Sequence, residues 1–335
     1  MMYKKSIITG LMALTATYSF ATTSSCGKVE IADMSWNSAS IMAYTDKFIL
    51  RYGFDCDAEL IPGDSIPISN AMTEKGRPDI APEMWSNAVQ TLIDRGVAEN
   101  SLRIAGKSYS DGGPEGFWVP KYMVDKNPSL ATIEGIKKHA KDFPNPENAS
   151  VSAFYGCPAG WGCQISSTNL FQALKLQESG FELINPGSSA ALSGSLSRAY
   201  ERKQPWFGYY WGPSAVLGKY DMVRVDFGSG VDKEHFINCI SKEDCLEPKV
   251  TMYPSAVSYS VTTSAFAKRA PDAYTYLTKR TFTNAQMNAL LAWMEENQAD
   301  GQYAAENFLL NHQEIWSQWV SKDIKTKLEK ALDKL

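Results

Sequence analysis

Four tryptophans occupy positions that an apolar core does not explain. Trp36, Trp85, Trp161 and Trp211 each follow a short strand-like segment and lie at or near the start of a helix-like one, among Gly, Ser, Pro and Asn. A core tryptophan usually belongs to an apolar stripe with a fixed period. Loops that leave the carboxyl ends of strands are where an open α/β sheet binds its ligand. The placement therefore predicts that the four side chains share a binding cleft.

Several indole faces in one cleft suit a cation that cannot donate strong hydrogen bonds. A methylated ammonium without an N–H group is held only by ring faces and partial charges. Each desolvated cation–π contact contributes up to about 2 kcal/mol. Three or four such contacts would support micromolar binding or tighter, about −8 kcal/mol or beyond, after the costs of association.

The segment after Trp161 favours an anionic oxygen on the same ligand. A helix that begins near Gln164 presents free N–H groups at its N-terminus, where an anionic oxygen binds without an arginine. Gly162 permits a close approach of the backbone. No arginine stands beside these motifs, which argues against a site for the α-carboxylate of an amino acid.

The elements around these residues alternate between strand and helix. Residues 29–32, 58–61 and 79–84 are predicted strands, and 40–52 is a predicted helix whose face carries Ile41, Tyr44, Phe48, Ile49 and Tyr52. A second run follows, with strands at 151–155, 181–184, 206–210 and 222–227 and helices near 165–177 and 188–202. Such an order predicts parallel strands covered by helices, in two α/β lobes.

Two further strands, 115–120 and 257–262, are predicted to cross between the lobes. The expected division is a signal peptide at 1–26, the first part of lobe I at 27–118, lobe II at 119–255, and a return to lobe I at 256–335. Helices dominate the last part, where Met287, Leu290, Leu291 and Met294 recur at helical spacing. Trp293, Trp316 and Trp319 lie in helical sequence and are expected to pack, and Trp206 is expected to be buried between a helix and a sheet.

The first residues predict export. Lys4 and Lys5 precede an apolar stretch, 7–21, that is too short to span a membrane comfortably, and small residues at 19–21 suit a cleavage site. The mature chain is expected to start between Thr22 and Gly27, in the periplasm. Cys26 leaves open a lipid anchor, although the preceding Thr-Ser-Ser lacks the apolar residue that a lipoprotein signal needs.

Export allows the six cysteines to be interpreted as disulfides. The close pairs predict bonds between Cys157 and Cys163 and between Cys239 and Cys245. Cys26 and Cys56 then remain, at the starts of two neighbouring strands. A lipid on Cys26 would instead leave Cys56 alone.

Charge and motifs exclude several classes of function. The formal net charge is −4, and no basic run suits nucleic acid or an anionic membrane surface. His139, His235 and His312 lack metal-ligand spacing. No phosphate-binding loop and no nucleophile elbow is present. We therefore expect a binding protein without a cofactor or metal, in a monomeric state.

The chain resembles the periplasmic binding proteins of ABC importers for glycine betaine and related osmolytes, over most of its mature length. The strongest match is the segment 156–163, Gly-Cys-Pro-Ala-Gly-Trp-Gly-Cys. It is similar to a disulfide-closed loop whose tryptophan caps the trimethylammonium and whose backbone amides, here those of Gly162 and Cys163, bind the ligand carboxylate. Trp85 and Trp211 are similar to two further cage tryptophans of that family, and Trp36 to one that some members carry.

The segment 118–123 is similar to the family's interlobe segment. The segment 115–118 resembles the corresponding stretch in a subset of the family that is associated with trimethylamine N-oxide. Glu83 lies two residues before Trp85, and Glu115 three before Trp118, so either could reach the cleft. A carboxylate there would repel a ligand carboxylate and favour a pure cation, such as choline, or a group that accepts a proton, such as an amine oxide. Glu83 is expected to be solvated or to serve a helix N-terminus, whereas Trp118 and Glu115 are taken as site residues.

The resemblance implies a two-lobed periplasmic binding protein fold of type II. It also implies capture of a small methylated-amine ligand by hinge closure and delivery to the membrane permease of an ABC transporter. The ligand stays open among glycine betaine, proline betaine, dimethylsulfoniopropionate, choline and trimethylamine N-oxide. The alternatives are an exported enzyme acting on small amines, a binding module for a choline-bearing polymer, and the same fold with another solute such as an amino acid.

Overall fold

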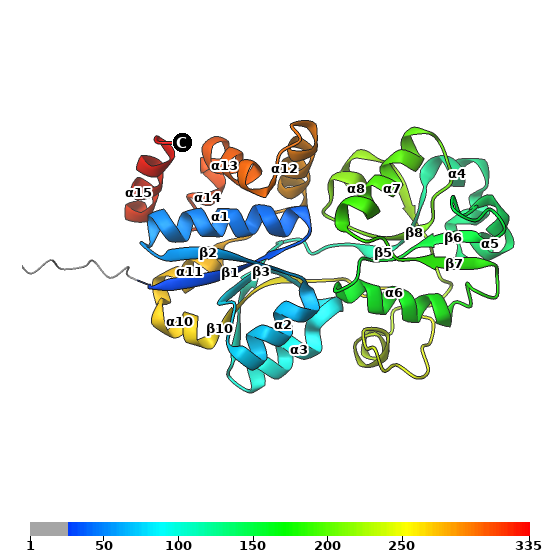
Figure 1. Cartoon of the computed structure of the whole chain (residues 1–335), viewed down its shortest axis with the longest axis horizontal. Helices are drawn as coiled ribbons and strands as arrows, with labels where there is room; N and C mark the ends of the chain where they lie inside the picture. Colours follow the sequence, from blue (N-terminus) through cyan, green and yellow to red (C-terminus); the bar gives the residue numbers. More distant parts are fainter. Residues whose placement is uncertain (1–25) are drawn as a thin grey trace, which may run out of the picture.

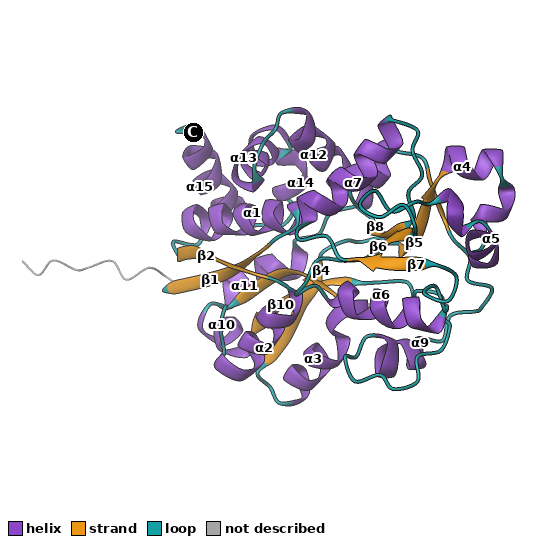
Figure 2. Cartoon of the chain, turned by 45° about the vertical axis from the view of Figure 1, so that its right-hand side comes forward, coloured by secondary structure: helices purple, strands orange, loops and turns teal. Residues whose placement is uncertain are grey.

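The computed structural model describes residues 26–335, which form two five-stranded sheets with helices on both faces (Figures 1 and 2). The predicted signal peptide lies outside the described residues, apart from Cys26. Within residues 26–335, every helix is too short or too polar to cross a membrane.

The first sheet has the order β2-β1-β3-β10-β4, in which β1 is parallel to β2 and β3 and β10 is antiparallel to its two neighbours. Its strands are β1 (Lys28–Met34), β2 (Asp57–Gly63), β3 (Ile80–Trp85), β4 (Leu102–Lys107) and β10 (Ser258–Thr263). The helices that follow these strands are α1 (Asn37–Gly53), α2 (Ser65–Lys75), α3 (Ser86–Ala98) and α10 (Ser264–Arg269).

The second sheet has the order β7-β6-β8-β5-β9, with β6 parallel to its neighbours and β5 antiparallel to β8 and β9. Its strands are β5 (Glu115–Pro120), β6 (Ser152–Tyr155), β7 (Phe181–Ile184), β8 (Gly208–Trp211) and β9 (Met222–Arg224). Its helices are α4 (Lys121–Lys126), α5 (Ile133–Lys138), α6 (Gly162–Ala173), α7 (Ser189–Glu201), α8 (Ala215–Lys219) and α9 (Lys233–His235), with short turns at Pro128–Ala131, Ala140–Asp142 and Phe236–Ile240.

The C-terminal helices return to the first lobe, where three of the five pack on α1 (Figure 1). They are α11 (Pro271–Lys279), α12 (Asn284–Glu296), α13 (Gly301–Asn311), α14 (Gln313–Trp316) and α15 (Lys322–Leu332). The predicted apolar face of α12 is buried, and so are Trp316, Trp319 and Trp206. The sequence predicted these packing positions correctly because their apolar residues recur at helical or strand spacing.

Both strands predicted to cross between the lobes exist, but each lies wholly inside one sheet. β5 pairs with β8 and β9 from Glu115 to Pro120, and β10 pairs with β3 and β4. The segments that connect the lobes come just before β5 and β10 in the sequence. They run side by side, and Gly113 of one donates its N–H to the carbonyl of Ala256 of the other at 3.2 Å. We therefore propose lobe limits near residues 114 and 256 in place of 118 and 255, since a strand is not divided between two lobes.

The buried face of α1 differs from the predicted one. Ile41 and Ile49 are buried, but Tyr52 is 44% exposed, and the fully buried Asp46 lies in the core face instead. Asp46 pairs with Arg280, which is also fully buried, at 3.1 Å, and accepts a hydrogen bond from Tyr276 at 2.6 Å. Hydropathy alone assigns a carboxylate to the surface, whereas a buried partner permits it in the core.

The three predicted disulfides are present: Cys26–Cys56, Cys157–Cys163 and Cys239–Cys245. The bond of Cys26 joins the starts of β1 and β2, and it leaves no thiol at Cys26 for a lipid. It also requires that any removed leader end before Cys26, one residue earlier than the boundary assigned from the sequence.

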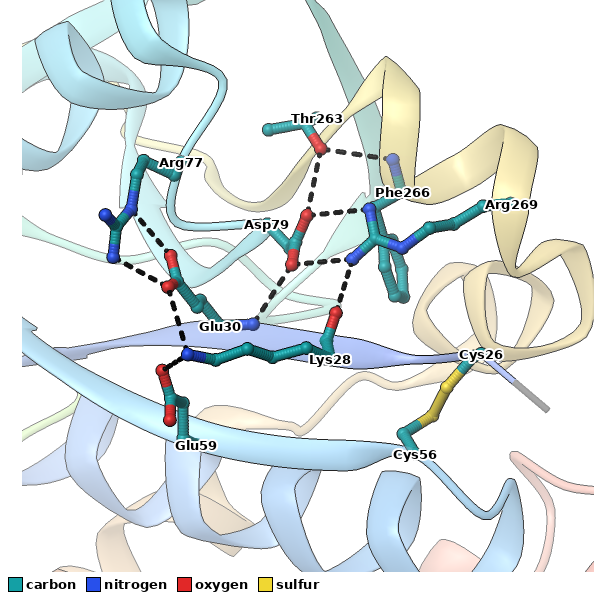
Figure 3. A network of polar contacts seen from close by, with 10 residues as sticks. All are labelled: Cys26, Lys28, Glu30, Cys56, Glu59, Arg77, Asp79, Thr263, Phe266 and Arg269. Atoms are coloured by element: carbon teal, nitrogen blue, oxygen red, sulfur yellow. Dashed lines mark hydrogen bonds and ion pairs between the residues drawn. A yellow bond between two sulfur atoms is a disulfide. The ribbon is translucent and has the colours of Figure 1, made fainter. Parts of the chain in front are cut away.

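A polar network at the start of β1 ties the returning chain to the first sheet (Figure 3). Arg269 of α10 donates two hydrogen bonds to Asp79, at 3.0 and 2.7 Å, and one to the carbonyl of Lys28 at 2.8 Å. Asp79 also accepts the backbone N–H of Glu30 at 3.0 Å. Since Asp79 is buried and joins β1, β3 and α10, its carboxylate connects segments that are distant in the sequence.

Replacing Asp79 with Ala is expected to lower the free energy of unfolding by about 2 kcal/mol, because it removes charge-assisted hydrogen bonds and leaves buried donors unpaired. Urea unfolding measures the loss. The control is Glu59→Ala, which removes an exposed ion pair to Lys28 and is expected to cost less than about 1 kcal/mol. Equal losses for both variants would contradict the role given to Asp79.

Candidate functional site

A small pocket of about 30 Å³ lies between the lobes, at the carboxyl ends of strands from both sheets. Its walls combine aromatic side chains, one carboxylate and a stretch of backbone. The lining residues are Trp36, Ser65, Trp85, Ala88, Glu115, Trp161, Gly162, Cys163, Tyr209 and Trp211.

The four tryptophans reach this pocket because each stands where a strand gives way to the next segment. Trp36, Trp85 and Trp161 are the N-cap residues of α1, α3 and α6, and Trp211 ends β8. Trp161 stands between two of the others, with ring centroids 5.2 Å from Trp36 and 5.1 Å from Trp211 and interplanar angles of 71° and 81°. In such edge-to-face contacts the rings pack directly against one another.

Hydrogen bonds to carboxylates fix three of the indoles. Trp36 and Trp85 donate their N–H groups to the same oxygen, Oε1 of Glu83, at 2.9 and 2.8 Å. Trp161 donates across the cleft to Oγ of Ser35 at 3.0 Å and to Oδ1 of Asp64 at 3.1 Å. The Trp161 bond joins the second lobe directly to the first.

Glu115 is the carboxylate in the pocket wall. The hydroxyl of Tyr209 donates to its Oε1 at 2.6 Å, and the side-chain amide of Asn87 donates to its Oε2 at 2.7 Å. Asn87 belongs to α3 in the first lobe and also donates to the carbonyl of Pro254 at 2.9 Å. Burial raises the pKa of Glu115 above its ordinary value, and the two hydrogen bonds oppose that shift.

Backbone from both lobes meets at Gly162. A Cβ atom on Gly162 would lie 2.3 Å from Cβ of Ala88, so the lobes approach here as closely as glycine allows. In the described part of the chain no side chain caps the N-terminus of α6. The first N–H groups of this helix therefore face the pocket as donors, and they suit an anionic oxygen.

Seven of the eight predicted site residues line the pocket, and Trp118 does not. The indole of Trp118 donates to the carbonyl of Tyr210 at 3.0 Å and borders a separate cleft with Pro114 and Met222. Glu115 and Trp118 are three positions apart on β5, and side chains alternate along a strand, so the two point to opposite faces.

Sequence reasoning missed Tyr209, Asn87, Ser65 and Ala88. Tyr209 had a readable signal, because it lies two residues before Trp211 on one strand and therefore shares its face. Glu83 likewise lies two residues before Trp85 on one strand and shares its face. It is fully buried behind the indoles, whereas the sequence led us to expect a solvated side chain. Asn87, Ser65 and Ala88 depend on how the lobes meet, which spacing does not reveal.

The chain is similar to known proteins over most of its length. Residues 27–311 match the family described as the substrate-binding domain of ABC-type glycine betaine transport systems. The glycine betaine, L-proline-binding protein of Borrelia burgdorferi is similar at 18% identity and a TM-score of 0.69, covering 90% of this chain and 99% of that one. A choline-binding protein in complex with choline shares 16% identity, with a TM-score of 0.68 and coverage of 92% and 99%.

A lactococcal glycine betaine-binding domain, in its closed conformation with glycine betaine, shares 20% identity at a TM-score of 0.65 and covers 88% and 100%. At such identities these likenesses show the fold alone. The fold is the two-lobed one predicted from the sequence, with an α/β sheet in each lobe.

The raised pKa of Glu115 predicts a pH-dependent effect of Glu115→Gln on stability. When the pH rises above 4.5, the ordinary pKa of a Glu carboxyl, Glu115 loses its proton in the unfolded chain before it does so in the folded one. The wild type therefore loses stability as the pH rises toward the raised pKa of Glu115 in the folded state. The variant keeps an acceptor for Tyr209 but has no charge to bury. Its free energy of unfolding relative to the wild type should therefore increase between pH 4 and pH 7 in urea titrations.

The control is Glu134→Gln, which changes an exposed carboxylate that pairs with Lys137. Its free energy of unfolding relative to the wild type should stay nearly constant over the same range. A Glu115→Gln curve parallel to that of the wild type would show that burial does not oppose ionisation at this site.

Proposed function

The chain belongs to the family of substrate-binding domains of ABC-type glycine betaine transport systems, and on that premise we propose that it captures a methylated ammonium osmolyte between its four pocket tryptophans. Proteins of this family bind solutes for a membrane permease and are not enzymes. They work on the extracellular or periplasmic side of the membrane. We propose that this chain reaches that side through the leader expected at its start.

One observation carries the proposal: four indoles, two from each lobe, line a single small pocket. The walls of this pocket stand close together, so only a compact ligand suits it. A quaternary nitrogen brings methyl groups and a spread positive charge, and ring faces satisfy both. An amino acid would need several hydrogen-bond acceptors for its ammonium group, and half of the residues that line the pocket are aromatic.

Within this class, Glu115 favours trimethylamine N-oxide over glycine betaine. A ligand carboxylate beside the buried Glu115 would be repelled unless one of the two groups took up a proton. The oxygen of an amine oxide accepts a hydrogen bond or a proton from Glu115 without bringing a second carboxylate. Three methyl groups and one oxygen also form a smaller ligand than a betaine.

Glycine betaine is the second candidate, and the uncapped N-terminus of α6 supports it. The N–H groups at Gly162 and Cys163 suit a ligand carboxylate as well as an oxide. The lactococcal structure of similar fold holds glycine betaine, and another similar structure holds choline.

Binding is proposed to couple to closure of the lobes. Two connections that run side by side at Gly113 and Ala256 form a natural hinge. The pocket is complete only when Trp161 and Trp211 meet Trp36 and Trp85, and contacts such as Trp161 with Asp64 span the cleft. A ligand that contacts indoles of both lobes therefore stabilises the closed form. The closed form is then the one that a permease would receive.

Titration of the purified protein with trimethylamine N-oxide, glycine betaine, choline and dimethylsulfoniopropionate by calorimetry tests the proposal. Saturable binding is expected, tightest for trimethylamine N-oxide, and Trp161→Ala should weaken it at least about tenfold by removing a central ring face. The control is Trp293→Ala, a half-buried residue of α12 packed on Tyr303, which should leave affinity unchanged. Absence of binding by all four ligands would refute the proposal.

Gly162→Ala tests the coupling to closure. The added methyl group meets Ala88 across the cleft, so it should oppose closure and weaken ligand binding at least about tenfold. Gly162 lies in the first turn of a helix, where Ala is accepted, so the melting temperature should not fall. Adding Ala88→Gly should restore part of the affinity. Unchanged affinity in Gly162→Ala would show that ligand binding does not need this approach of the lobes.

A further inference from the structure

Glu83 is a buried carboxylate directly behind two walls of the pocket. It lies on β3, two residues before Trp85, and is fully buried. Its Oε1 accepts the indole N–H groups of Trp36 and Trp85 and the hydroxyl of Ser38, at 2.9, 2.8 and 3.1 Å. Three donors on one oxygen are the arrangement expected of an ionised acceptor.

No cation balances this carboxylate within residues 26–335. Glu83 takes part in no ion pair there, and its further polar neighbour is the neutral hydroxyl of the buried Tyr109. The fully buried Arg280 is paired with Asp46 and donates to the carbonyl of Pro82 and to Ser260. A buried charge without a partner is unfavourable, so it needs a compensating role.

The pocket is where a compensating charge would bind. The indole N–H edges of Trp36 and Trp85 point at Glu83, while both rings line the pocket. A negative charge at the N–H edge shifts electron density toward the ring face and lowers the potential there. Both effects strengthen the attraction of a cation to those faces.

We infer that Glu83 determines charge specificity: it holds Trp36 and Trp85 in place and makes the pocket select a positively charged nitrogen over an uncharged group of the same shape. This inference rests on the proposed function, because it concerns the same ligand. Glu83 does not line the pocket and acts through the two indoles, so it is a positioning residue that also supplies charge.

The rival explanation is that Glu83 is only a hydrogen-bond acceptor that fixes two rings. Glutamine separates the two, because its oxygen can accept the same N–H groups while the charge is gone. A purely structural acceptor would lose nothing specific in Glu83→Gln. A charge-supplying residue would lose affinity for cations and keep affinity for uncharged ligands.

The experiment compares matched ligand pairs on the wild type and on Glu83→Gln. The pairs are choline with its carbon isostere 3,3-dimethylbutan-1-ol, and trimethylamine N-oxide with tert-butanol, measured by calorimetry or by competition. The variant is expected to lower the preference for the member with the positively charged nitrogen at least about tenfold, while affinity for the all-carbon member stays within about threefold. The control is Asp79→Asn, a buried carboxylate remote from the pocket, which should leave the preference unchanged.

A preference that is unchanged in Glu83→Gln, or equal loss of both members of a pair, overturns the inference while ligand binding by the wild type still supports the proposed function. If the wild type binds neither choline nor trimethylamine N-oxide, the proposed function fails, and charge selection by Glu83 fails with it.

Indole N–H resonances provide a readout that needs no ligand. In proton–nitrogen spectra of the whole protein, Glu83→Gln should move the signals of Trp36 and Trp85 together, identified with Trp36→Phe and Trp85→Phe. The signal of Trp316, whose N–H donates to the carbonyl of Leu309, should stay in place. Unmoved signals for Trp36 and Trp85 would show that the shared carboxylate does not hold these rings in solution, and would overturn the inference.

Discussion

Hydrogen bonds from indoles to carboxylates of the first lobe organise the pocket of this protein. Trp36 and Trp85 share Glu83, and Trp161 reaches Asp64 from the other lobe. An indole that donates its N–H at a fixed point can rotate little, so its face keeps one orientation. The orientation of the aromatic walls is therefore set by polar contacts at their edges.

The parallel sheets explain why these residues can meet at all. In each lobe the central strands run in one direction, so the residues that follow them gather at one edge of the sheet. The two edges face one another across the cleft, and the contact of Gly162 with Ala88 shows how closely they approach. A larger residue than glycine at that point would hold the lobes apart and enlarge the pocket beyond the size of a small ligand.

Buried charge is distributed in two ways in the molecule. Away from the pocket, Asp46 pairs with Arg280 and Asp79 with Arg269, and these pairs connect distant segments of the first lobe. At the pocket, Glu83 and Glu115 are buried with neutral donors in place of a cation, and burial raises the pKa of both. A protein that binds a positively charged nitrogen has a physical reason to keep such carboxylates, because that nitrogen interacts favourably with them.

The sequence by itself determined the two-lobed α/β fold, the three disulfides and the positions of the four tryptophans at strand ends. These depend on local periodicity and on two close cysteine pairs, which leave Cys26 and Cys56 as the third pair. Alternation along a strand also held information that was not used: it places Tyr209 beside Trp211 on one face and sets Trp118 opposite Glu115. β4 escaped prediction because it is a short edge strand whose exposed side chains do not alternate clearly.

Only the tertiary structure decided the partners of these residues. Trp36 and Glu83 are 47 positions apart, and Trp161 and Asp64 are 97 apart. The same holds for Asn87, which reaches Glu115 from the other lobe, and for Asp46, whose burial depends on Arg280. A hydrogen-bond donor can bond to any acceptor oxygen nearby. Its partner is therefore fixed by which strands and lobes come together, and the packing of the whole chain determines their arrangement.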